Sequence, residues 1–290
     1  MSENKTGVFV GSRQLMLKDN SNNITFPVLV QYPTMQPSGP VSFGPYTMDV
    51  SKDAAVMEGQ FPLVVISHGN GGSHLIYRSI STFLAKQGFI VAMPEHFGNN
   101  RNNNSLENTD TNLQYRPAHI SLVIDDLLAA DWCSKNILQQ KIAVIGHSMG
   151  GYTALALAGG IPRSREGAVI PVKADPRVRA IVLMAPGAGW FLHSLNSVTI
   201  PVLLLMAEHD PVTPAWNAAV ILESISSKAL VDYRSIANAG HFSFITPFPA
   251  SMKSPGFPPS TDPEGFDREA FHLQLPRDIL DFLNKQLALQ

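Results

Sequence analysis

Residues 141–158 read KIAVIGHSMGGYTALALA and decide the fold. The segment opens with the apolar run Ile142–Ile145, which suits a buried strand, and closes with the pattern Tyr152–Ala158, which suits a helix packed on a sheet. Between them lies Gly146-His147-Ser148-Met149-Gly150, a G-x-S-x-G pattern in strand–turn–helix context. That context predicts a nucleophile elbow with Ser148 at the tip of a sharp turn. On the alternative interpretation, the serine only caps the helix.

The composition suits a large α/β protein and excludes several classes of site. Of 290 residues, 44% are hydrophobic and 15% are charged, so a sizeable core can form. Lys and Arg total 21 against 23 Asp and Glu, and no basic block alternates with aromatic residues, so we expect no nucleic-acid partner. Cys133 is the only cysteine, which excludes an internal disulfide and a thiolate zinc cluster.

Long apolar runs are missing from the sequence. The N-terminal patch Val8–Val10 is too short for the core of a signal peptide, and no run approaches the length of a membrane span. We therefore expect a protein that stays in the cytoplasm as synthesised, with no membrane span. The sequence leaves the oligomeric state open.

Strand and helix patterns alternate from residue 62 onward, which predicts a mostly parallel, doubly wound sheet with helices on both faces. Ahead of it, residues 6–31 predict N-terminal antiparallel strands, and the Pro/Gly/Ser-rich stretch 33–60 predicts an irregular, solvent-facing loop. The asparagine-rich stretch 98–112 is expected to be a mobile surface loop. We predict a single domain over residues 1–290 with no large lid. The expected strands cover residues 62–67, 89–93, 142–145, 179–185, 200–207 and 230–236, and the expected helices cover 75–87, 120–134, 152–158, 214–224 and 271–289.

An activated serine needs a base within hydrogen-bonding reach, and the base needs a carboxylate to orient it. In open parallel sheets these groups lie in loops that follow the strands, in the chain order serine, acid, histidine. The strand over 200–207 runs into Asp210, and the strand over 230–236 runs into His241. We therefore predict Asp210 as the acid and His241 as the base.

Other candidates for these two roles fit less well. Glu208 and Asp175 remain alternatives for the acid. His147 lies inside the elbow, and its side chain is expected to point away from the nucleophile. His68 ends the strand over 62–67 and is expected to brace the loop that follows.

The developing negative oxygen of an acyl-transfer reaction needs two backbone N–H donors. One is expected from Met149, the residue after the serine. The other is expected from the glycine-rich loop His68–Gly72, where Asn70 is the first choice and Gly71 the second.

Aromatic residues near the predicted strand ends are candidates for the pocket walls. No long insertion separates residues 186 and 200, so we expect an open site that suits short or soluble acyl groups. The Pro-rich stretch 246–268 is long enough to fold over its mouth. The candidate pocket residues are Gly71, Phe97, Trp190, Phe191 and Phe242, with Phe244 beside the base.

Five segments together resemble the α/β-hydrolases of the platelet-activating-factor acetylhydrolase and dienelactone-hydrolase-like group. The segments are SHGNGG (67–72), QGFIVAMPEH (87–96), IGHSMGGYTALALAG (145–159), DPRVRAIVLMAPG (175–187) and AGHFSF (239–244). The resemblance implies the α/β-hydrolase fold. Two departures keep the substrates of that group from being transferred. The acetylhydrolases look to carry their acid where this chain has Met184-Ala185-Pro186, and dienelactone hydrolases use a cysteine where it has Ser148.

These residues predict a serine hydrolase that cleaves carboxylic esters of short or soluble acyl groups through an acyl-enzyme, with no metal and no cofactor. Its only expected partner is a small-molecule ester. Because the histidine base must be neutral, activity is expected to fall as the pH drops through about 6 to 7. An amidase, an acyltransferase or thioesterase with the same triad, and a non-catalytic binding protein remain alternatives.

Overall fold

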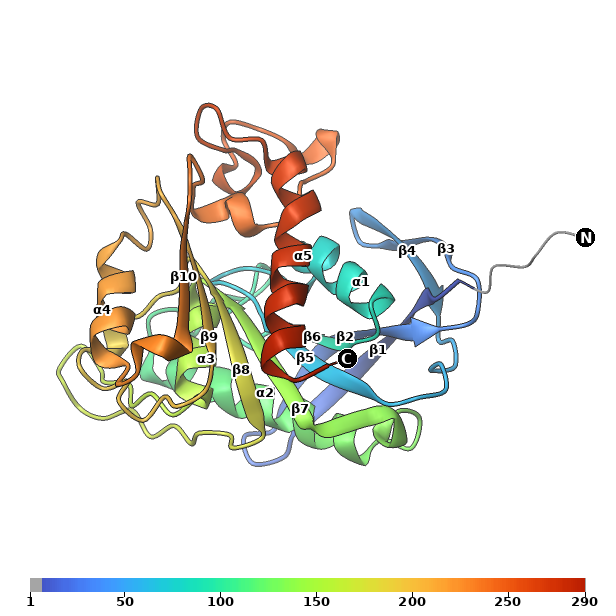
Figure 1. Cartoon of the computed structure of the whole chain (residues 1–290), viewed down its shortest axis with the longest axis horizontal. Coiled ribbons are helices and arrows are strands. Elements are labelled where there is room, and N and C mark those ends of the chain that lie inside the picture. Colours follow the sequence, from blue (N-terminus) through green and yellow to red (C-terminus); the bar gives the residue numbers. More distant parts are fainter. Residues whose placement is uncertain (1–6, 290) are drawn as a thin grey trace, which may run out of the picture.

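One ten-stranded sheet with helices on both faces organises the computed structural model, which describes residues 7–289 (Figure 1). The strand order is β10-β9-β8-β7-β5-β6-β2-β1-β4-β3. The strands are β1 (Phe9–Asp19), β2 (Ile24–Thr34), β3 (Gly39–Phe43), β4 (Tyr46–Lys52), β5 (Phe61–Ser67), β6 (Ile90–Pro94), β7 (Ile137–His147), β8 (Val178–Met184), β9 (Val202–Ala207) and β10 (Val231–Ile236). The helices are α1 (Arg78–Lys86), α2 (Asp110–Ala129), α3 (Met149–Leu157), α4 (Trp216–Ser224) and α5 (Arg268–Gln286).

Six neighbouring strands of the sheet, β10-β9-β8-β7-β5-β6, are parallel to one another. On the other side of β6, β2 pairs antiparallel with β6 and with β1. Each face of this sheet has its own hydrophobic cluster, because successive side chains of a strand point to opposite faces. On β5, Leu63 and Val65 pack with residues of α2, α3 and α4, while Val64 and Ile66 pack with residues of α1 and α5. The predicted α/β-hydrolase architecture, mostly parallel with helices on both faces, is confirmed.

The prediction of an irregular loop over residues 33–60 is wrong, because this stretch contains β3 and β4. These strands form an antiparallel pair, and β4 also pairs with β1. The sequence does carry the signal: Tyr46, Met48 and Val50 are buried and alternate with exposed residues. The surrounding Pro, Gly and Ser residues hid this alternation. Tyr46 turns out to line a pocket.

Helix α2 begins ten residues before the predicted start and continues through Pro117. Thr109 caps its first turn by accepting a hydrogen bond from the Asn112 N–H at 3.2 Å. A proline inside a helix has no N–H for the carbonyl four residues earlier. Here that carbonyl, on Leu113, accepts a hydrogen bond from the Tyr152 hydroxyl at 3.0 Å. A side chain from α3 thus compensates for the lost backbone bond.

The remaining elements lie close to their predicted positions. The antiparallel strands expected over 6–31 are β1 and β2, although residue 6 lies outside the described residues. No helix in the described part of the chain is long and apolar enough to cross a membrane. The cytoplasmic location and the single domain over 1–290 stay predictions.

Candidate active site

Ser148 occupies a strained turn between β7 and α3. Its φ of 55° and ψ of −118° lie outside the allowed regions for a residue with a side chain, which costs about 1–3 kcal/mol. Glycine is required on both sides. A Cβ on Gly146 would lie 2.0 Å from the Gly150 oxygen, and one on Gly150 would lie 1.9 Å from the Ser67 oxygen. The Ser148 side chain makes no capping hydrogen bond to α3, so the helix-cap interpretation is wrong.

His241 and Asp210 form a buried hydrogen-bonded pair. The Nδ1 atom of His241 lies 2.8 Å from Oδ2 of Asp210. The other Asp210 oxygen, Oδ1, accepts hydrogen bonds from the N–H groups of Val212 and Thr213, each at 2.8 Å. Burial raises the pKa of Asp210, but the bonds from His241 and Thr213 outweigh it and keep the pKa below its usual value. The carboxylate is therefore ionised at neutral pH.

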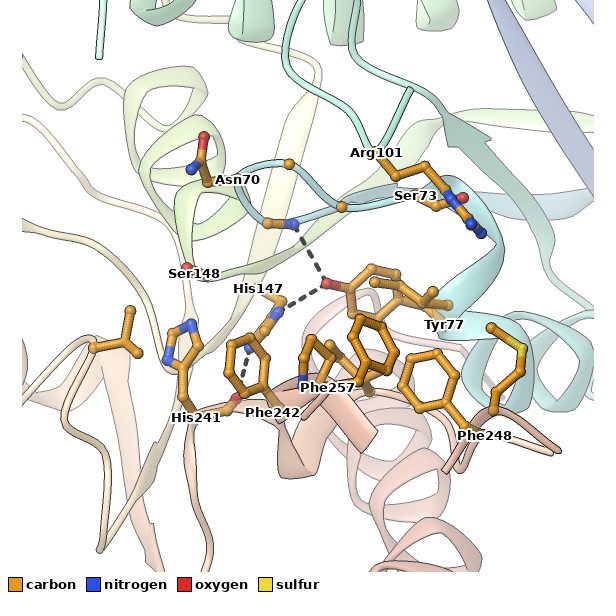
Figure 2. A pocket seen from close by; sticks show the side chains of 18 of the residues that line it. Asn70, Ser73, Tyr77, Arg101, His147, Ser148, His241, Phe242, Phe248 and Phe257 are labelled. Atoms are coloured by element: carbon orange, nitrogen blue, oxygen red, sulfur yellow. Dashed lines mark hydrogen bonds between the residues drawn. The ribbon is translucent and has the colours of Figure 1, made fainter. Parts of the chain in front are cut away.

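Ser148 and the His241 ring lie at the same end of one pocket (Figure 2). Because Nδ1 of His241 is engaged with Asp210, Nε2 is the ring nitrogen left for a group in that pocket. The two alternative acids have other partners. Glu208 accepts a hydrogen bond from the Asn238 N–H, and Asp175 pairs with Arg177 at 2.6 Å.

Tyr77 and His147 connect the glycine-rich loop to the backbone of His241, which the sequence did not indicate. The Gly69 N–H donates to the Tyr77 hydroxyl at 3.4 Å, and that hydroxyl lies 2.8 Å from Nδ1 of His147. The Nε2 atom of His147 lies 2.9 Å from the His241 carbonyl oxygen (Figure 2). Burial, followed by the charge of His241, lowers the pKa of His147 to about 3. His147 is therefore neutral, with its proton on Nε2.

The loop after β5 lies against Ser148, as predicted. A Cβ on Gly69 would lie 3.2 Å from Cβ of Ser148. The neighbouring Asn70 is held through its side chain, which accepts from Asn99 and donates to Glu107. Its backbone N–H makes no hydrogen bond within residues 7–289. Met149 is the first residue of α3, where an N–H has no intrahelical acceptor.

The asparagine-rich stretch 98–112 is not simply a surface loop, because it holds Asn70. Asn99 and Asn100 are buried, and the Asn100 amide donates to the His96 carbonyl at 2.8 Å. His68 also braces the glycine-rich loop, as expected: its Nδ1 lies 2.8 Å from the Gly69 oxygen.

Arg116 is buried at the centre of this arrangement. Its guanidinium donates to the carbonyl of His68, to Asn99 at 2.6 Å and to Thr153 on α3 at 3.1 Å. Burial lowers its pKa to about 9, and no carboxylate of the described residues forms an ion pair with it. Arg116 thus ties the glycine-rich loop, the asparagine-rich stretch and the elbow helix together.

Replacing Arg116 by methionine is expected to lower the free energy of unfolding by about 1–3 kcal/mol, because the His68 carbonyl and the Asn99 amide oxygen lose a buried donor. We also expect kcat for an ester to fall, since Asn70 loses its support through Asn99. Urea unfolding and steady-state kinetics measure the two effects. A variant with unchanged stability and unchanged kcat would show that these bonds contribute nothing.

Two pockets meet at Ser148, and both are also lined by Asn70 and Val212. The aromatic pocket, of about 480 Å³, has Arg101 on one wall and an apolar wall opposite (Figure 2). Its apolar lining includes Tyr46, Ile76, Phe242, Phe248, Met252 and Phe257. The arginine pocket, of about 410 Å³, is lined by Asn108, Arg163, Arg165, Trp190, Trp216 and Asn217, among others.

Three of the predicted pocket residues line these cavities, and two do not. Gly71 and Phe242 line the aromatic pocket, and Trp190 lines the arginine pocket. Phe97 packs against the core, and Phe191 is fully buried with its ring stacked on Tyr152 at 5.2 Å, so the prediction for both is wrong.

The Pro-rich stretch 246–268 forms part of the aromatic pocket. Phe248, Met252, Phe257 and Pro259 contribute to its lining. No sequence pattern indicated that Arg163, Arg165 and Trp216 line a pocket, although Trp216 lies within the helix expected over 214–224. Among residues 7–289, no group of three or more His, Cys, Asp or Glu could hold a metal ion.

Comparisons with known proteins point to one fold. The family model described as the alpha/beta hydrolase fold matches residues 62–194. Cutinase est1 of Thermobifida alba is 25% identical over 181 residues, which cover 62% of this chain and 53% of that protein. Platelet-activating factor acetylhydrolase of Canis lupus familiaris is 28% identical over 196 residues, 52% of this chain and 44% of that protein. The matches thus span about half the length of these relatives.

A solved structure agrees over the whole chain. The ferulic acid esterase from Streptomyces cinnamoneus superposes with a TM-score of 0.77 at 18% identity, covering 100% of this chain and 93% of that one. At this identity the likeness shows the fold. Together with the family match and the sheet order, it shows that the chain has the α/β-hydrolase fold.

Proposed function

We propose that this protein is a serine hydrolase that cleaves carboxylic esters, with Ser148 as nucleophile, His241 as base and Asp210 as the acid that orients it. The buried His241–Asp210 hydrogen bond at 2.8 Å, beside the strained Ser148 at one pocket, carries this proposal. The similarity to cutinases and the shared fold of a ferulic acid esterase support an ester as the substrate.

The first half of the reaction forms an acyl-enzyme. Oγ of Ser148 attacks the ester carbon while its proton passes to Nε2 of His241. The N–H groups of Asn70 and Met149 hold the negative oxygen of the tetrahedral intermediate. Asp210 stabilises the charged ring. His241 then gives the proton to the alcohol oxygen as the C–O bond breaks.

The second half releases the acid. A water molecule gives a proton to His241 and attacks the acyl carbon, and the proton returns to Ser148 as the acid leaves. We propose that the acyl group is short or compact, because both pockets at Ser148 are limited in volume, at about 480 and 410 Å³.

A series of 4-nitrophenyl esters from acetate to palmitate, with the 4-nitroanilide of butyric acid as the matched amide, tests this proposal. We expect kcat/KM to be highest for the shorter esters and at least ~10²-fold lower for the anilide, whose amine leaves poorly unless it is protonated in the transition state. Equal turnover of ester and anilide would instead identify an amidase. Turnover of no ester by the folded protein would favour a binding protein.

A further inference from the structure

The arginine pocket opens at Ser148 but plays no part in the chemistry described above. Two of its walls are aromatic: Trp190 follows β8, and Trp216 begins α4. The backbone of Gly189 lies against the Trp216 ring, since a Cβ there would lie 3.0 Å from it. Trp216 is 53% exposed, which leaves its ring accessible to a ligand. This lining suits a flat or apolar group.

The same pocket carries positive charge. Arg163 and Arg165 line it, and its lining includes no Asp or Glu. Within residues 7–289, neither arginine lies within ion-pair distance of a carboxylate. The segment is also anchored, because the Arg163 N–H donates to the Trp190 carbonyl at 2.8 Å and its Nη1 donates to the Gly167 carbonyl at 3.0 Å. Glu166, between Ser164 and Gly167, does not line the pocket.

The position of His241 decides which half of an ester enters each pocket. The base must lie within hydrogen-bonding reach of the leaving oxygen to protonate it. His241 lines the aromatic pocket and does not line the arginine pocket. The alcohol therefore leaves along the aromatic pocket. The acyl group, on the other side of the carbonyl carbon, extends into the arginine pocket.

We propose that the arginine pocket binds an acyl group with a flat or apolar body and an anionic group at its far end, such as the half-ester of an aromatic dicarboxylic acid. Guanidinium groups bind carboxylates through two parallel hydrogen bonds, which suits an anion at the end of such a body. The alcohol half is apolar and lies against the phenylalanines of the aromatic pocket. This inference rests on the proposed ester hydrolysis and adds a substrate class to it.

Two matched esters test the charge preference: butyl 4-carboxybenzoate and butyl 4-carbamoylbenzoate, which differ only in the anionic group. We expect the wild-type protein to prefer the charged ester by roughly tenfold in kcat/KM, a modest effect because both arginines are exposed to solvent. The double variant R163Q/R165Q should lose this preference and with it the faster turnover of the charged ester. R179Q, which removes an arginine on β8 paired with Gln140, should keep both.

The outcomes separate this inference from the proposed function. Equal rates for the two esters in the wild-type protein would overturn the inference but leave ester hydrolysis intact. Loss of the preference in R101Q instead of R163Q/R165Q would place the acyl group in the aromatic pocket and also overturn it. Hydrolysis of neither ester by a protein that does hydrolyse a 4-nitrophenyl ester would overturn the inference alone, whereas hydrolysis of no ester at all would overturn the proposed function with it.

A binding measurement tests the pocket without turnover. Benzene-1,4-dicarboxylate should quench the tryptophan fluorescence of the Ser148→Ala variant, since Trp190 and Trp216 are two of only three tryptophans in the chain. The R163Q/R165Q substitutions should weaken this binding by roughly tenfold. Equal binding with and without these arginines would contradict the inference.

Discussion

Replacing Ser148 by alanine is expected to lower kcat/KM for the best ester by ~10⁶-fold, because the acyl-enzyme can no longer form. The fold should be preserved, since alanine has no larger side chain to fit into the turn and Ser148 makes no capping hydrogen bond. Initial rates with the wild-type protein and the variant, together with circular dichroism, measure the two properties. Turnover that survives the substitution would exclude Ser148 as the nucleophile.

The acid should matter nearly as much. Asp210→Asn keeps the size of the side chain but removes the charge that stabilises the protonated His241 ring. In enzymes with this arrangement the corresponding loss in kcat is about 10⁴-fold. Combining Asp210→Asn with Ser148→Ala should cost little more than Ser148→Ala alone, because the residues act as a unit. Additive losses in the double variant would show that Asp210 acts independently of Ser148.

The free energy of unfolding is expected to fall steeply as the pH drops from about 6.5 to about 4, since buried histidines must stay neutral in the folded state. Burial lowers the pKa of His119 and His272 to about 4 and that of His147 to about 3. It also places the pKa values of His68 and His96 well below the usual range.

The sign follows from where each state binds protons. The unfolded chain takes up protons below a pH of about 6.5, whereas the folded chain does so only near the lowered pKa values. The stabilisation is therefore complete above pH 6.5 and is lost progressively below it. Each such histidine contributes a slope of up to about 1.4 kcal/mol per pH unit. Urea unfolding at pH 7.5, 6.0 and 5.0 measures the combined slope.

His119→Phe provides a matched control for this slope. The His119 ring stacks on Phe26 with a centroid distance of 4.5 Å, so phenylalanine should fit. Its Nε2 lies 3.5 Å from Asp19, and neither ring nitrogen has a well-formed hydrogen bond. In this variant, we expect the change of the unfolding free energy with pH to be smaller by the contribution of one histidine, up to about 1.4 kcal/mol per pH unit. An unfolding free energy that is constant between pH 7.5 and 5.0 would contradict the neutral histidines.

The parts of the site that lie at strand ends could be predicted from the sequence. Ser148, Asp210 and His241 each follow a predicted strand, and parallel strands bring their carboxyl ends to one edge of the sheet. Their positions could therefore be predicted from the local strand patterns alone, without knowledge of tertiary contacts. The order of the chain leaves Asp210, Glu208 and Asp175 as possible acids, and the 2.8 Å hydrogen bond to His241 selects Asp210.

Other features depend on contacts that a sequence pattern does not contain. The helical stretch around Pro117 needs the Tyr152 hydroxyl from another helix. Phe191 is core because it stacks on Tyr152, while its neighbour Trp190 faces a pocket. Arg163 and Arg165 lie in an irregular segment. Such a segment has no helical or strand periodicity from which to predict which side chains reach the site. Tertiary packing decides each of these.

The most direct test of the triad is the reaction of the protein with an alkyl fluorophosphonate, followed by mass spectrometry of its peptides. Oγ of Ser148 should form the bond to phosphorus as fluoride leaves, with His241 taking the proton, so we expect one phosphonyl group on Ser148. Labelling should be lost in His241→Ala and slowed in Asp210→Asn. A folded protein that carries no label on Ser148, or that labels equally fast without His241, would contradict the proposed chemistry.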